Sequence, residues 1–272
     1  MDPHFRIASQ TDLRLMADWA AAEGWNPGLD DAAPFHAADP AGFFLAEVGG
    51  RPVACISVVN HGPDAAFLGF YICHPDWRGQ GIGKALWDHA LAHAGARVVG
   101  LDGVAAQEAN YALSGFVRAG ASRRFTGPLE PEAAGDVRAV TAADLPELLA
   151  LDAAACGYRR EAFLSVWVAP AETRRTVRDG AEGFATIRRC REGVKIGPII
   201  AGDPAQAMRL AHAALAELPS DQVYIDTAAG SPLADHLRAL GWQETFATAR
   251  MYRGAAPEGS GRLMAIASME LG

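Results

Sequence analysis

The amino-acid sequence predicts an α/β (α+β) fold made of two similar units in tandem. An apolar run at 66–73 leads through a glycine-rich turn into an amphipathic helix, which indicates a buried strand followed by a helix. Two further apolar segments flank Gly49-Gly50-Arg51-Pro52, a combination typical of a β-hairpin. The pattern that opens the chain also recurs beyond residue 135, and 272 residues are enough for two cores of ordinary size.

The first half has the order strand, helix, hairpin, strand, glycine turn, helix, strand, helix and strand. Ser9 or Thr11 can cap the first helix, whose apolar side chains share one face until turn-forming residues end it at 23–28. Pro75 ends the central strand, because proline cannot donate to a sheet ladder. We expect strands at 5–8, 42–48, 53–59, 66–73, 97–101 and 121–125, and helices that begin near 10, 82 and 105.

The turn Arg78-Gly79-Gln80-Gly81-Ile82-Gly83-Lys84 has the chemistry of an anion site. Its three alternate glycines lie at a helix start, where backbone N–H groups can converge on a ligand of phosphate size without interference from Cβ atoms. A nucleoside-triphosphate loop is excluded, because Arg78 stands in place of its first glycine and Ala85 in place of its hydroxyl. A dinucleotide fingerprint is excluded, because Lys84 occupies its third glycine position. The alternative is an ordinary strand-to-helix turn whose glycines serve flexibility alone.

What remains, R-x-x-G-x-G directly after an apolar strand, strongly resembles the pyrophosphate loop of the GNAT acetyltransferases. The resemblance covers about residues 4–127, where the order of elements is also that of a GNAT domain. It implies a mixed, mostly antiparallel central sheet flanked by helices, with acyl-CoA bound beside the central strand. We therefore expect a GNAT domain at 1–127, a proline-rich, acidic linker at 128–135 and a second domain at 136–272.

The second domain repeats the first but lacks its glycine turn. Residues near both ends of the first domain recur in the same order: Arg6, Ser9, Asp12 and Leu101-Asp102 reappear as Arg138, Thr141, Asp144 and Ile225-Asp226. Where the turn should stand, segment 198–204 holds Asp203 and Pro204, which bring a negative charge and a missing donor. This arrangement resembles tandem GNAT proteins with a working N-terminal domain and a degenerate C-terminal one, so the second domain is expected not to hold CoA.

The ending at 251–272 reads as a strand hairpin around 255–261. The first domain has only one predicted strand between its last helix and the linker. We therefore expect a C-terminal strand to pack against or complete the first domain's sheet. Two separate, self-contained sheets are the alternative.

The resemblance implies where acyl-CoA would be held. Tyr71, Ile72 and Cys73 match the strand positions whose backbone binds pantetheine, and a free N–H there could also stabilise the oxyanion of the reaction. The pyrophosphate would be held by Arg78, Gly79, Gln80, Gly81, Ile82, Gly83 and Lys84. Buried strand core is the other interpretation of 71–73. Both interpretations can hold, because the ligand uses backbone and the core uses side chains.

The resemblance also implies a proton donor and an acceptor pocket. Tyr111 lies four residues before Gly115-Phe116, the position of a tyrosine that protonates the departing CoA thiolate in many GNAT enzymes. A tyrosine packed on an amphipathic helix fits equally. Trp25 and Asn26 fall where GNAT domains build the acceptor pocket, although an indole that caps a core is the commoner role. No spacing selects a general base, and a water chain serves as well as any of the candidates Glu23, Glu47, His61, Asp64 and His74.

Composition narrows the class of partner. A net charge of −8 and a pI near 5.5 argue against nucleic acid, which requires a basic surface. The four cysteines and eight histidines have no metal-ligand spacing, so no metal is expected, and reduced thiols favour the cytoplasm. No apolar run approaches a membrane helix, and no basic segment with an apolar stretch opens the chain, so we expect neither a membrane span nor a signal peptide.

These features together predict an acetyltransferase. It would move an acetyl group from acetyl-CoA to a primary amine of a small-molecule acceptor, by direct attack in a ternary complex, as a monomer or homodimer. A non-catalytic acyl-CoA-binding or sensing module is one alternative, because it would need the same loop. An enzyme that acetylates the amine of another protein is a second, weaker one, because the chain has no basic or aromatic-rich recognition tail.

Overall fold

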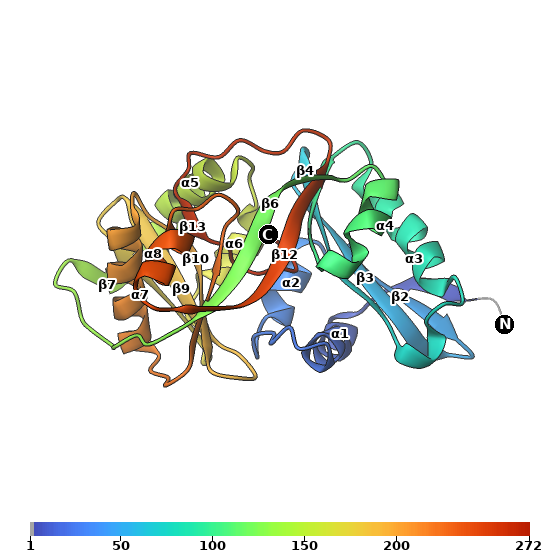
Figure 1. Cartoon of the computed structure of the whole chain (residues 1–272), viewed down its shortest axis with the longest axis horizontal. Coiled ribbons are helices and arrows are strands. Elements are labelled where there is room, and N and C mark those ends of the chain that lie inside the picture. Colours follow the sequence, from blue (N-terminus) through green and yellow to red (C-terminus); the bar gives the residue numbers. More distant parts are fainter. Residues whose placement is uncertain (1–2) are drawn as a thin grey trace.

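The computed structural model describes residues 3–272, which form one continuous sheet with helices on both faces (Figure 1). The first half contains β1 (His4–Ile7), α1 (Gln10–Ala22), α2 (Ala32–Ala38), β2 (Phe43–Val48), β3 (Arg51–His61), β4 (Ala65–Cys73), α3 (Ile82–Leu91), β5 (Val98–Gly103), α4 (Glu108–Leu113) and β6 (Val117–Thr126). The second half contains β7 (Val137–Ala139), α5 (Leu145–Cys156), α6 (Glu161–Trp167), β8 (Arg174–Asp179), β9 (Gly183–Arg189), β10 (Val194–Ile200), α7 (Pro204–Glu217), β11 (Val223–Thr227), α8 (Leu233–Ala239), β12 (Gln243–Arg253) and β13 (Leu263–Ala265).

The sheet has 13 strands in the order β1-β2-β3-β4-β5-β12-β6-β11-β13-β10-β9-β8-β7. Only β4–β5 and β10–β11 pair in parallel, and the other pairs among the described residues are antiparallel. The predicted mixed, mostly antiparallel sheet with flanking helices is therefore confirmed. The sheet does not divide at residues 128–135, because strands of the two halves alternate at its centre.

The two halves exchange their long exit strands. Strand β12 of the second half pairs with β5 and β6 of the first, and β6 of the first half pairs with β11 of the second (Figure 1). This confirms that a C-terminal strand completes the first domain's sheet. The predicted hairpin around 255–261 is wrong, since β13 pairs with β10 and β11 rather than with β12. Strands do lie on either side of 255–261, but β12 begins earlier than expected, at Gln243, and the sequence pattern did not specify the partner of either strand.

The repeat in the sequence corresponds to a repeated local structure. In both halves an arginine on the first strand pairs with the aspartate of a capping box at the start of the next helical segment. The first box joins Ser9 with Asp12, and the second joins Thr141 with Asp144. Each arginine lowers the pKa of its aspartate, chiefly through the side-chain hydrogen bond. The two halves therefore share these local contacts as well as the repeated sequence pattern.

A buried ion pair fixes each exchanged strand. Asp102 on β5 accepts hydrogen bonds from Arg250 on β12, and Asp226 on β11 accepts two from Arg124 on β6. Burial alone would raise the pKa of Asp226, but Arg124 and then Lys195 outweigh it and lower that pKa to about 2. All four paired side chains are at least nine-tenths buried, so each pair ties one half of the chain to the other away from solvent.

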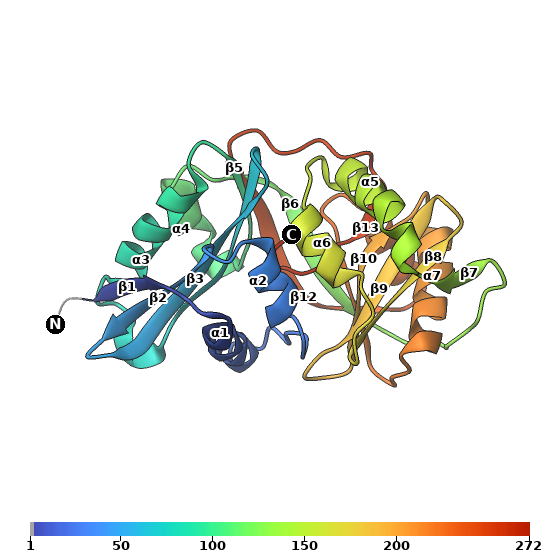
Figure 2. The same cartoon turned by 180° about the vertical axis from the view of Figure 1, so that it is seen from behind.

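Three apolar clusters fill the layers. Alternate residues of the strands face opposite sides, so that Phe43 packs with α1 and α2 while its neighbour Phe44 packs on the side of α3. Helices α7 and α8 cover the same side of the second half. On the other side α2 and α6 meet (Figure 2). There Phe35 stacks on Trp167 with ring centroids 6.1 Å apart. That cluster is shared by both halves, which supports the molecule folding as one unit.

No helix within residues 3–272 is both long enough and apolar enough to span a bilayer.

Candidate active site

A cavity of about 590 Å³ lies beside the end of β4 and is open to solvent. The first half supplies most of its wall: the end of β4, the glycine turn, the start of α4 and the end of β5. Glu23, Trp25, Trp77 and Arg124 of the first half also line it, and the exchanged strand β12 and the chain ending supply the rest. The lining residues from these last two segments are Phe246, Thr248, Met269 and Glu270.

The cavity exists because β4 and β5 separate. Their parallel ladder ends at the pair Leu68–Leu101, although β4 continues to Cys73. On its other side β4 stays paired with β3, but the register shifts, so that Phe70 and Tyr71 lie opposite a single residue of β3. Phe70 has a positive φ of 48°, which is uncommon for a non-glycine residue. Residues 69–73 therefore have no strand on the β5 side, and Tyr71, Ile72 and Cys73 all line the cavity.

The glycine turn closes one end of the cavity with exposed backbone. Gly79 and Gly81 have φ values of 76° and 81°, and a Cβ added to either would meet no atom within 4 Å. Gly81 is the N-cap of α3, so the free N–H groups at the positive end of that helix lie at the cavity. Gly83 and Lys84 also line the cavity, whereas Ile82 is buried in the core of its own half. The open space next to these amides is a suitable place for an anion.

The side chains of Arg78 and Gln80 form hydrogen bonds that stabilise the turn itself. The Arg78 Nε–H donates to the Cys73 carbonyl at 2.9 Å, and its guanidinium pairs with Glu23 at 2.5 Å. Gln80 donates to the Asp76 carbonyl at 3.1 Å and does not line the cavity. Arg78 thus ties the turn both to the end of β4 and to the segment after α1. In this arrangement the backbone N–H groups of the turn, more than its side chains, are free to bind a ligand.

Tyr111 lies on α4 at the wall of the cavity. Its ring stacks on Trp87 with centroids 5.4 Å apart and planes 14° from parallel, and the residue is 7% exposed. Burial, and then the nearby Tyr71, raise the pKa of Tyr111 to about 12. The hydroxyl is therefore protonated near neutral pH. The ring therefore packs in the core and the residue also lines the cavity, while its role as the proton donor stays a prediction.

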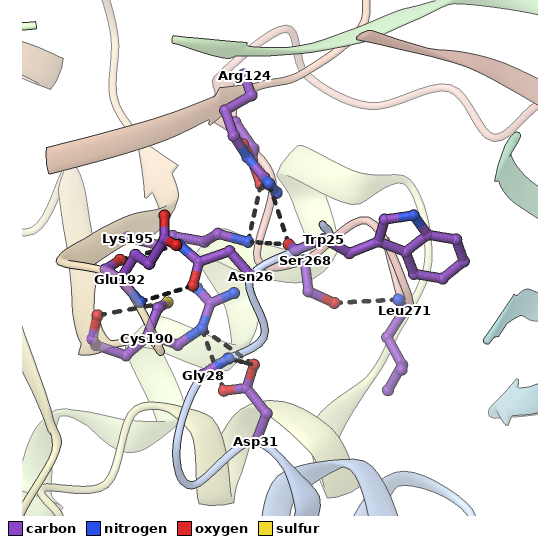
Figure 3. A network of polar contacts seen from close by, with 12 residues as sticks. Trp25, Asn26, Gly28, Asp31, Arg124, Cys190, Glu192, Lys195, Ser268 and Leu271 are labelled. Carbon is purple, nitrogen blue, oxygen red and sulfur yellow. Dashed lines mark hydrogen bonds and ion pairs between the residues drawn. The ribbon is translucent and has the colours of Figure 1, made fainter. Parts of the chain in front are cut away.

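The segment after α1 is anchored to the second half (Figure 3). The Trp25 carbonyl accepts hydrogen bonds from Arg124 and Lys195, both at 3.0 Å. Trp25 lines the cavity, but Asn26 does not: its side-chain amide exchanges two hydrogen bonds with the backbone of Glu192. Asn26 therefore serves to join the halves in this structure, and Trp25 alone of this predicted pair faces the cavity.

The equivalent place in the second half is filled by the chain itself. Strands β10 and β11 also run parallel and then separate, after the pair Ile196–Ile225. Strand β13 occupies the gap and pairs with both of them. A Cβ on Gly197 would collide with the Ile266 carbonyl, so this filling is close. At the start of α7, Asp203 uses its carboxylate to cap the N–H of Gln206 at 2.7 Å, which puts a negative charge where the first half has open amides.

Glycine is required where the chain ending approaches β4. A Cβ on Gly69 would collide with the Glu270 carbonyl oxygen, and this neighbour is backbone that cannot rotate away. We expect Gly69→Ala to lower the free energy of unfolding by about 1–3 kcal/mol, as overpacked sites do. Chemical denaturation would measure this. Gly135→Ala is the matched control, because a Cβ there meets nothing within 4 Å; equal stability of the two variants would contradict the close approach.

Within residues 3–272 no group of three or more histidine, cysteine, aspartate or glutamate side chains is arranged to hold a metal ion.

Comparison with known proteins decides the family. Residues 11–120 match the model of the acetyltransferase (GNAT) family, and residues 148–264 match that of an acetyltransferase (GNAT) domain. A holothin acyltransferase from Pseudoalteromonas sp. (strain SANK 73390) is 37% identical, over 97% of this chain and 93% of its own. The chain belongs to the GNAT acetyltransferase family. It is an enzyme of the acyltransferase class with two GNAT domains in tandem.

Solved GNAT structures share the fold over nearly the whole chain. A putative acetyltransferase from Pyrococcus horikoshii has a TM-score of 0.83 at 19% identity and covers 99% of this chain and 96% of its own. A tandem GNAT protein from the clavulanic acid biosynthesis pathway has a TM-score of 0.61 at 17% identity, covering 95% of this chain and 100% of its own. At these identities the likeness concerns the fold alone.

Most of the GNAT residues proposed from the sequence lie around the cavity. Those that line it are Trp25, Tyr71, Ile72, Cys73, Arg78, Gly79, Gly81, Gly83, Lys84 and Tyr111. No motif in the sequence selects the lining residues from β6, β12 and the chain ending. Arg124 alone carried a signal, as a charged residue within a predicted exit strand. The others were brought to the cavity by the strand exchange.

Proposed function

We propose that this GNAT enzyme transfers an acetyl group from acetyl-CoA to a primary amine of a small-molecule acceptor, by direct attack in a ternary complex. The observation that carries the proposal is one cavity that joins the open glycine turn, the separated end of β4 and Tyr111 to a second, partly apolar end. A donor and an acceptor could be held there together.

The glycine turn and β4 would hold the donor. The N–H groups at the start of α3 suit a diphosphate, because Gly79 and Gly81 leave open space beside them. The backbone of 69–73 has no strand partner on the β5 side and could bind the pantetheine arm. An N–H of Ile72 or Cys73 could stabilise negative charge on the thioester oxygen. In the second half β13 and Asp203 occupy the matching positions, which supports one donor site per chain.

The other end of the cavity would hold the acceptor. Trp25, Phe246 and Met269 provide apolar surface there, next to Arg124 and Glu270. The 37% identical relative is named a holothin acyltransferase, which supports acyl transfer as the reaction. A monomeric or homodimeric state and a cytoplasmic location stay predictions from the sequence.

A transfer assay tests the proposed function. The purified protein is incubated with acetyl-CoA and a panel of amines, amino acids and polyamines, and release of CoA is compared with formation of the acetylated product. We expect stoichiometric product and CoA for at least one small amine. Tight binding of acetyl-CoA without transfer to any acceptor would favour the sensing module, and transfer only to an added protein would favour the enzyme that acetylates the amine of another protein.

Tyr111→Phe should slow turnover without weakening donor binding. The phenyl ring keeps the stack on Trp87, but the group that would protonate the departing thiolate is lost. Positioned proton donors contribute about 100-fold or more to rate, so we expect a loss of kcat on that order, with the Kd for acetyl-CoA unchanged by calorimetry. Turnover equal to that of the parent would exclude Tyr111 as the donor.

A further inference from the structure

The acceptor end of the cavity contains one charged side chain that no protein group satisfies. Glu270 is 5% exposed and lines the cavity. Within residues 3–272 its carboxylate makes no hydrogen bond and no ion pair, and its oxygens are not among the sealed polar atoms that lack a partner. What remains accessible of this side chain therefore faces the cavity. A carboxylate buried to this degree normally has a partner.

The other charged side chains at the cavity already have hydrogen-bond or ion-pair partners within the protein. Asp102 accepts hydrogen bonds from Arg250, Ser122 and Thr248. Arg124 donates to Asp226 and to the Trp25 carbonyl. Glu23 is paired with Arg78 of the glycine turn. By elimination, Glu270 is the one acidic group at the acceptor end that is left to bind a ligand.

The position of Glu270 is fixed by the fold. The turn that carries it is held by the Leu271 N–H, which donates to Ser268 Oγ at 3.1 Å, and by the Gly272 N–H, which donates to the Ser268 carbonyl at 3.0 Å (Figure 3). His61 lies 3.1 Å from the Leu271 carbonyl, and Arg160 donates to the Gly272 carbonyl at 2.5 Å. The Glu270 backbone itself lies against Gly69, next to the bulge of β4. The backbone of Glu270 is thus held beside the bulge of β4, at the wall of the cavity.

We infer that Glu270 binds the ammonium group of the acceptor, and that the acceptor class is a primary amine on an apolar body without a carboxylate of its own. An ammonium provides three donors to an unpaired carboxylate. Trp25, Phe246 and Met269 provide the surface for the apolar body. An acidic acceptor would instead be repelled by Glu270. The inference rests on the proposed function, to which it adds a residue from the second half.

A purely structural role is the competing explanation. Arg124, Arg188 and Lys195 are buried, and Glu270 is close enough for its charge to favour their protonated forms, although burial still lowers the pKa of Lys195. Glu270 could therefore serve only to balance these cations beside Asp31 and Asp226. A charge-balancing residue would affect stability and both substrates together, whereas an acceptor-binding residue would affect the acceptor alone.

Glu270→Gln tests the two explanations with 2-phenylethylamine as acceptor. Because a hydrogen bond to a charged group contributes roughly 1.5–3 kcal/mol, we expect KM for the amine to rise on the order of 10- to 100-fold. The Kd for acetyl-CoA should stay at the parent value, and Glu270→Asp should lie between parent and Gln variant. Glu217→Gln on the exposed side of α7 is the matched control and should change nothing. An unchanged amine KM, or an equal loss of acetyl-CoA binding, would overturn the inference.

A second measurement uses the unmodified protein, in case the Gln variant does not fold. Thermal stabilisation in the presence of CoA is compared for 2-phenylethylamine, 2-phenylethanol and phenylacetate, which share a body but differ in charge. We expect the order amine, alcohol, acid, with apparent affinity for the amine at least about ten-fold above that for the alcohol. An alcohol that stabilises as well as the amine overturns the role of Glu270. The proposed function fails separately, if the parent acetylates no amine at all.

Discussion

Gly81→Asp is expected to abolish acetyl-CoA binding while leaving the fold intact. Gly81 has a φ of 81°, which aspartate tolerates better than most residues, and its Cβ would enter open space. The carboxylate would then stand at the start of α3, in the place proposed for the diphosphate. Two unit charges about 4 Å apart repel by about 4 kcal/mol at an effective dielectric of 20, so we expect affinity to fall roughly 100- to 1,000-fold by calorimetry.

Two matched variants separate charge from shape. Gly81→Asn has nearly the same shape and tolerates the same backbone conformation without the charge, so it should lose much less affinity. Gly241→Asp places the same side chain at a φ of 82° after α8, also with nothing within 4 Å, and should bind acetyl-CoA like the parent. If Gly81→Asp binds as well as Gly241→Asp, the diphosphate does not lie at this turn.

Arg250→Met is expected to cause the largest loss of stability. Its guanidinium donates to both oxygens of Asp102, at 3.0 and 2.6 Å, and the Asp102 side chain is 0% exposed. Methionine would leave that carboxylate buried with only two hydroxyl donors, from Ser122 and Thr248. Removing one partner of a buried pair costs about 3–5 kcal/mol, which corresponds to a fall in Tm on the order of 10 °C for a chain of this size.

The reason for this loss can be checked with a double variant. Adding Asp102→Asn removes the buried charge that Arg250→Met leaves without a partner, so it should restore part of the lost stability. Arg118→Met, at a half-exposed pair with Glu108, should change stability very little. A double variant less stable than Arg250→Met, or a surface variant as unstable, would contradict the importance of this pair for the exchanged strand β12.

The sequence predicted the parts of the fold that depend on local pattern. The expected strand at 66–73 is β4 at Ala65–Cys73, and the helix expected from 82 is α3 at Ile82–Leu91. The hairpin around residues 49–52 forms, because two glycines with positive φ join β2 and β3. Arg6 and Asp12 recur in the sequence as Arg138 and Asp144. This repetition correctly indicated a second, similar unit.

The sequence could not predict contacts that depend on the exchange of strands. The ending at 251–272 predicts a strand hairpin, but no local pattern shows that β12 begins at Gln243 and lies between β5 and β6. No sequence feature selects Glu270, between Met269 and Leu271, as a site residue. Only the folded chain brings its backbone against Gly69. Likewise, Asp203 and Pro204 argued against CoA in the second half, but only the structure adds that β13 fills the gap there.

A crystal structure of the protein grown with acetyl-CoA tests the central claim most directly. We predict one acetyl-CoA in each chain, with the diphosphate on the N–H groups of residues 79–84 and the pantetheine arm along residues 69–73. The acetyl group should point to the end of the cavity formed by Trp25, Phe246 and Glu270. A diphosphate at the start of α7, or a cavity beside β4 that stays empty at saturating acetyl-CoA, would contradict the account.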